Sequence, residues 1–112
     1  MPVISEGTGT QTATLATEHI LATLTGAKTY MLMVDATNMV GGATPDTVVL
    51  RVKAKALTAG AEILAYEQSF VGAQGSKLKV SIPIPSLFSC SFTLTQTLGA
   101  AGRAYPWVVM SV

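Results

Sequence analysis

The sequence predicts an all-β protein: a single antiparallel β-sandwich or jelly-roll-like domain of about seven or eight strands. Apolar and polar residues alternate with a period of two in several segments, as they do along strands that have one packed and one exposed face. Runs rich in glycine, proline, asparagine and aspartate separate these segments. The length of 112 residues suits one domain with one modest core.

The first residues, "MPVISEGTGTQTAT", are polar and rich in glycine and threonine. We expect residues 1–10 to form an amino-terminal arm, either flexible or ordered only on a neighbouring subunit. Residues 11–112 then form the sandwich domain. Its expected strands cover residues 10–17, 19–25, 28–35, 47–57, 62–70, 77–84, 88–98 and 104–112.

Three of these strands have the clearest alternation. In "TVVLRVKAKAL", Leu50 and Val52 alternate with charged residues. In "KLKVSIPIP" and "FSCSFTLTQTL", every second residue is again apolar, so we expect each apolar series to face the core. These series are Leu78, Val80, Ile82 and Ile84, and Phe88, Cys90, Phe92 and Leu94. Pro83 falls on the exposed phase, which indicates an edge or an early strand end.

The turn signals predict hairpin connections between consecutive strands. They are Thr58–Gly60, Gly72–Ser76 and the "GAAG" of Gly99–Gly102. In the last of these, glycine tolerates a positive φ. Arg103, which follows the turn, is expected to reach a nearby carboxylate or carbonyl group.

Composition narrows the function classes. Charged residues make up 12% of the chain, about half of the usual quarter. The net charge of +1 gives no strong field for nucleic acid or an anionic membrane, so we expect neither as a partner. The chain lacks an apolar run of membrane-spanning length and the features of a signal peptide, which favours a soluble protein made in the cytoplasm.

The low charge also bears on assembly. With a mean hydropathy of +0.48, a free soluble protein risks association. Burying surface against partners would remove that risk, and this favours an assembly subunit. The alternative is a well-folded monomer with a surface of threonine, serine and glycine.

The residues that could carry chemistry are few, and we expect no catalytic, metal or cofactor site. His19 is the only histidine and Cys90 the only cysteine. We interpret His19 as a hydrogen-bonded or exposed structural residue. Cys90 is expected to be a buried, inert thiol, with an interchain bridge or a nucleophile as the alternatives. Asp35, Asn38 and Asp46 flank one loop, where turn formation is favoured over calcium binding.

The closing segment contains the largest side chain of the protein. Pro106 suits an edge or the entry of a strand. Trp107, with Val109 on the same face, is either a plug in the core or an anchor in an interface. The candidate interface or structural anchors are Tyr30, Arg103, Tyr105, Pro106 and Trp107.

Residues 28–112 resemble small structural proteins of tailed bacteriophages. The resemblance lies in "YMLMVDATNM", "LRVKAKALTAGAEILAY" and "FTLTQTLGAAGRAYPWVV". Its most specific part comprises Gln96, Thr97, Gly102, Arg103, Tyr105, Pro106 and Trp107.

This resemblance implies a non-enzymatic virion protein that decorates, or cements, the capsid. Its partners would be the major capsid protein and further copies of itself, as a dimer or trimer. It would be synthesised in the host cytoplasm and would reside on the capsid surface. The alternatives are a tail or fibre module and a surface-displayed carbohydrate-binding β-sandwich.

Overall fold

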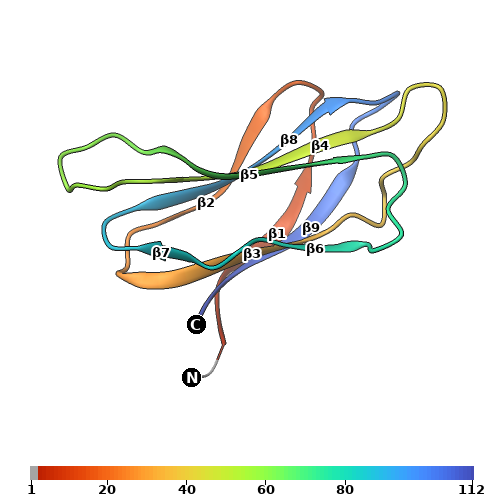
Figure 1. Cartoon of the computed structure of the whole chain (residues 1–112). Helices are drawn as coiled ribbons and strands as arrows, with labels where there is room; N and C mark the ends of the chain where they lie inside the picture. The colour runs from red at the N-terminus through yellow and green to blue at the C-terminus, as the bar shows by residue number, and fades with distance from the viewer. Residues whose placement is uncertain (1–2) are drawn as a thin grey trace.

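The computed structural model describes residues 3–112, which form two antiparallel sheets packed face to face (Figure 1). Sheet A has the order β1-β9-β3-β6, with β7 also paired to β3, and sheet B has the order β2-β8-β4-β5. The described part of the chain thus confirms the predicted β-sandwich, with nine strands. The strands are β1 (Ile4–Thr12), β2 (Glu18–Leu24), β3 (Lys28–Asp35), β4 (Thr47–Ala54), β5 (Ile63–Val71), β6 (Leu78–Val80), β7 (Ile84–Ser86), β8 (Cys90–Leu98) and β9 (Ala104–Ser111).

The core lies between the central strands of the two sheets. Leu32 on β3, Leu94 on β8 and Val109 on β9 are fully buried. The rings of Tyr30 and Phe92 meet edge to face across the two layers, with their centroids 6.5 Å apart, a favourable aromatic geometry. The alternation predicted for β4 and β8 is confirmed, because their apolar series face inward.

The first strand differs from the prediction. It begins at Ile4, pairs with β9 and ends at Thr12, where a strand at residues 10–17 was expected. Most of the expected arm is therefore a strand, while Met1 and Pro2 lie outside the described residues. The reason is the ring of Trp107, which lies over this strand: a Cβ at Gly9 would sit 3.4 Å from it. The indole packs against the backbone of Gly7 and Gly9, so this segment contacts the core without apolar side chains of its own.

The phase predicted for "KLKVSIPIP" is wrong over most of its length. Leu78 and Val80 are about half exposed, whereas Ser81 is buried. The Ser81 hydroxyl accepts a hydrogen bond from the Leu32 amide at 2.9 Å, so it satisfies a backbone donor that has no strand partner there. β6 ends at Val80 and β7 begins at Ile84, so the early strand end predicted from Pro83 is confirmed.

One of the three predicted hairpins is confirmed. Thr58–Gly60 lies between the paired strands β4 and β5, and this hairpin projects beyond the neighbouring strands (Figure 1). The other two turns cross between the sheets: Gly72–Ser76 joins β5 to β6, and Gly99–Gly102 joins β8 to β9. No hairpin forms at the latter because β8 already lies between β2 and β4.

Replacing Gly102 with alanine should destabilise the fold. A Cβ at this position would overlap the Ala13 carbonyl oxygen, and backbone atoms have little room to move because the Ala13 amide donates to the Arg103 carbonyl at 2.8 Å. We expect Gly102→Ala to lower the free energy of unfolding by roughly 1–3 kcal/mol, measured by chemical denaturation. The control is Gly75→Ala, which meets no atom within 4 Å and should change stability by less than about 0.5 kcal/mol. Equal losses in both variants would contradict the steric explanation.

Candidate functional site

The five predicted anchor residues occupy different environments. Tyr30 and Tyr105 are buried in the core, so they stabilise the fold and offer no surface to a partner. Trp107 is half-buried and packs against the core from β9. Pro106 is exposed on the opposite face of the same strand. Arg103 lies at the start of β9, with its side chain 27% exposed.

His19 is hydrogen-bonded and Cys90 is buried, as predicted. The Nε2 atom of His19 accepts a hydrogen bond from the Thr14 amide at 3.0 Å. Cys90 is a free thiol with no exposed surface. Its burial raises the pKa of the thiol, which disfavours the reactive thiolate form.

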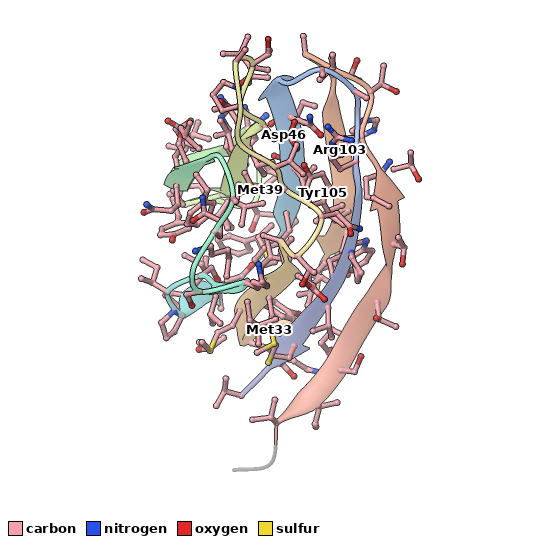
Figure 2. All side chains as sticks on the ribbon, turned by 90° about the vertical axis from the view of Figure 1, so that its right-hand side faces the viewer. Met33, Met39, Asp46, Arg103 and Tyr105 are labelled. Atoms are coloured by element: carbon pink, nitrogen blue, oxygen red, sulfur yellow. The ribbon has the colours of Figure 1, made fainter. Side chains whose placement is uncertain are left out.

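Four side chains form a buried polar cluster at one end of the sandwich: Asp46, Gln96, Arg103 and Tyr105. Asp46 has no exposed surface, and its Oδ2 atom accepts from the Arg103 Nε atom at 3.0 Å and from the Val40 amide at 2.9 Å. Figure 2 shows Asp46, Arg103 and Tyr105 close together in its upper part. The predicted contact between Arg103 and a carboxylate is thereby confirmed.

Gln96 is the centre of this cluster. Its Oε1 atom accepts from the Tyr105 hydroxyl at 2.9 Å and from the Arg103 amide at 3.0 Å. Its Nε2 atom donates to the Asp46 Oδ1 atom at 3.2 Å and to the Ala101 carbonyl at 2.8 Å. Both donors and both lone pairs of the amide are therefore used. Burial, followed by the Asp46 charge, raises the pKa of Tyr105 to about 12.

The sequence pattern places Gln96 among the buried residues of its strand, which our prediction did not use. Gln96 follows Phe92 and Leu94 on the inward phase of β8, and a polar residue at a core position must find hydrogen-bond partners. The pattern does not identify those partners. Because the groups of the cluster are bonded to one another, its arrangement supports a structural role.

The loop residues considered for calcium do not converge. Asp35 accepts hydrogen bonds from the Thr37 amide and hydroxyl, a turn arrangement that lowers the pKa of its carboxyl group. Asn38 donates to the Ala104 carbonyl at 2.8 Å, and Asp46 belongs to the polar cluster. Within residues 3–112, no three histidine, cysteine or acidic side chains gather in a way that could hold a metal ion. The same residues contain no helix long and apolar enough to span a membrane.

The outer face of sheet A is apolar over β3, β6 and β9, whereas β1 adds threonines to it. We name it the methionine face, because it carries three of the five methionines of the chain. Its side chains come from the outward positions of β3, β6 and β9, and within the described residues Asp35 is the only ionisable one among them. A shallow groove of about 210 Å³ crosses this face beside Met33, Leu78 and Pro106. The apolar members are Met31, Met33, Leu78, Val80, Pro106, Val108 and Met110.

The outer face of sheet B is charged, and we name it the charged face. Arg51 on β4 forms an ion pair with Glu67 on β5, with a nitrogen–oxygen distance of 2.6 Å. Glu18 on β2 pairs with Lys53 at 3.0 Å and accepts from the Thr93 hydroxyl at 2.7 Å. The hydrogen bond from Thr93, followed by that from Lys53, lowers the pKa of Glu18. The ion-paired side chains of β2, β4 and β5 therefore form a charged outer surface on sheet B.

A larger hollow of about 660 Å³ lies where several strands end. Ile4, Pro85 and Leu87 line it together with Lys28 and Lys55. The Lys28 ammonium group already contacts Glu6 at 2.9 Å. Its lining also includes Thr29, Ser86 and Ser111, and among the described residues this lining contains no histidine or acidic residue.

Removing the Tyr105 hydroxyl should make stability less dependent on alkaline pH. The folded-state pKa of about 12 exceeds the ordinary value of 10.0, so the contribution of Tyr105 to stability is fully present below pH 10 and is lost as the pH rises toward 12. Tyr105→Phe should cost about 1 kcal/mol near neutral pH through the lost hydrogen bond and should reduce the alkaline decline, measured by urea denaturation. A smaller decline should remain from Tyr30, whose pKa burial also raises. Tyr66→Phe, outside the cluster, should keep the full decline; identical profiles for both variants would contradict the prediction.

Removing the Glu18 charge should affect acid stability. Its pKa in the folded protein lies below the ordinary value of 4.5, so its stabilising contribution is present above pH 4.5 and is lost as the pH falls through the folded-state pKa. We expect Glu18→Gln to lower Tm at neutral pH and to flatten the decline of Tm below pH 4.5, measured by calorimetry. Parallel Tm profiles for the variant and the wild type would exclude this contribution.

The chain has no match among the known proteins with which it was compared. No protein-family model and no curated protein sequence match it, and no solved structure does. The two contrasting outer faces are therefore the basis for an assignment of function.

Proposed function

We propose that this protein is a non-enzymatic structural component of a tailed-bacteriophage virion that decorates and cements the capsid. It would contact the major capsid protein through the methionine face and would present the charged face to solvent. The observation that carries this proposal is the contrast between the outer faces of the two sheets. One holds several half-buried or exposed apolar side chains and a single carboxylate, and the other holds ion pairs.

The physical chemistry of the methionine face supports docking on another protein. Covering an apolar surface with a partner is favourable, whereas each charge buried without a partner costs several kcal/mol. Methionine side chains are flexible and polarisable, so they adapt to an irregular surface. Leu78 is 51% exposed and Val80 46% exposed, which leaves apolar area for such a contact.

The choice of a phage capsid as the partner rests on the resemblance of residues 28–112 to phage structural proteins. Cementing would then follow from mass action: a protein that binds the assembled shell, and not its free subunits, shifts the equilibrium toward the shell. Many copies would add their small individual contributions. The chain needs no catalytic group for this activity.

The alternative of carbohydrate binding has less support. Sugar-binding surfaces would use exposed aromatic side chains, for which Tyr30, Tyr66, Tyr105 and Trp107 are the candidates. Tyr30 and Tyr105 are buried, and Tyr66 and Trp107 are half-buried and packed against the core. The methionine face therefore favours a protein partner.

A charge placed on the methionine face should weaken docking. We expect the wild-type protein to cosediment with phage heads that lack it, and Val80→Glu to bind at least tenfold more weakly, because the contact would bury the new carboxylate. The matched control is Ile20→Glu, since Ile20 is an exposed apolar residue on the charged face, 65% exposed. This variant should bind as the wild type does.

Two outcomes would contradict the proposal. Equal binding of Val80→Glu and the wild type would exclude the methionine face as the contact. Absence of wild-type binding to heads would exclude the capsid, and binding to purified tails in the same experiment would favour the tail alternative.

A further inference from the structure

The two sheets have four edges, and three of them carry features that discourage pairing with another chain. β1 contains Gly7 and Gly9 and has an irregular register between Ser5 and Gly7. β2 has a similar irregularity between Ile20 and Ala22. The third edge consists of two three-residue strands, β6 and β7, separated by a break that contains Pro83. Bulges, short strands and proline are established ways of protecting a sheet edge.

The fourth edge, β5, has one irregularity in its register with β4, between Val52 and Lys53, and it lacks these protections over the rest of its length. Residues 66–71 pair with β4 without irregularity, and the strand contains no glycine or proline. Its one charged residue is Glu67, which pairs with Arg51 on the charged face. Within residues 3–112, β4 is the only strand that pairs with β5. The other side of β5 therefore presents unpaired backbone amides and carbonyls, which form a template for a further strand.

We propose that β5 pairs antiparallel with β5 of a second copy of this chain, in a register centred on Gln68. The contact would join the two copies of sheet B into one eight-stranded sheet. A twofold axis perpendicular to this sheet would relate the copies, as is usual for homodimers. This inference does not depend on the proposed capsid function.

The side chains of β5 favour a second copy as the occupant. With Gln68 opposite its own counterpart, Tyr66 lies opposite Phe70 of the other copy, and this aromatic pair occurs twice. Both side chains are half-buried against the core, and the Lys79 ammonium group lies 4.6 Å from the centre of the Phe70 ring. The pairs would therefore extend the apolar layer beside this cation. Cross-strand aromatic pairs stabilise antiparallel sheets, and the strand is thus complementary to itself.

Other registers are less favourable. A register centred on Glu67 would bring two carboxylates directly opposite each other, which is destabilising. A shift by one residue would place inward side chains opposite outward ones. In the register centred on Gln68, Glu67 lies opposite Ser69 of the other copy, and no like charges meet.

The first test measures mass and covalent capture of the full chain. The wild type should have twice the chain mass of 11.6 kDa in solution. Gln68→Cys should form a covalent dimer on mild oxidation, because directly opposed Cα atoms lie about 4.5–5.5 Å apart, within disulfide range. Ser69→Cys is the matched control: its two copies would be about 8 Å apart and should not cross-link. The native Cys90 is buried and should not interfere.

The second test uses charge at the centre of the register. Gln68→Lys and Gln68→Glu should each be monomeric, because like charges would face each other, and a mixture of the two should restore the dimer. Thr10→Lys, on the exposed part of edge strand β1, should remain dimeric. A monomeric wild type, equal cross-linking of Gln68→Cys and Ser69→Cys, or a mixture that stays monomeric would each overturn the proposal.

Discussion

The buried carboxylate of Asp46 is the constraint on which one end of the sandwich depends. A buried charge costs several kcal/mol unless donors surround it. Here the donors come from the Val40 amide, the Gln96 side chain and the Arg103 guanidinium group. They belong to the loop before β4, to β8 of sheet B and to the start of β9 in sheet A. The carboxylate is satisfied only when all three segments are in place, so it couples the two sheets.

The position of β9 in turn determines which of its side chains lie on the methionine face. Gln96 bonds the Tyr105 hydroxyl, which fixes Tyr105 on the inward phase of β9. Side chains alternate along a strand, so Trp107 and Val109 also point inward, and Val108 and Met110 must point outward. A one-residue slip of β9 would exchange these two sets. The same polar contacts that complete the core therefore keep the apolar outer surface in register.

The sequence pattern was sufficient for the sandwich and for strands whose apolar phase faces the core, such as β4 and β8. It failed for β1, because that strand packs through its glycine backbone against Trp107 rather than by apolar side chains of its own. It also failed for Leu78 and Val80, since alternation shows that two faces differ and does not show which one is buried. The partner of Arg103 was predictable as a type of group, a carboxylate or carbonyl. Its identity as Asp46, 57 positions away in the chain, depends on the loop packing that only the structure reveals.

The two proposed contacts are geometrically compatible. An axis perpendicular to sheet B leaves sheet A of each copy on the same side of the dimer, so both methionine faces would point toward the same partner surface. Two faces held in one body bind with a high effective concentration once the first has docked. A weak contact through each methionine face would then be enough for stable attachment. Pairing through β5 uses its free backbone groups and the side chains of Tyr66 and Phe70 at the margin of the core. It would therefore leave both the methionine face and the charged face uncovered.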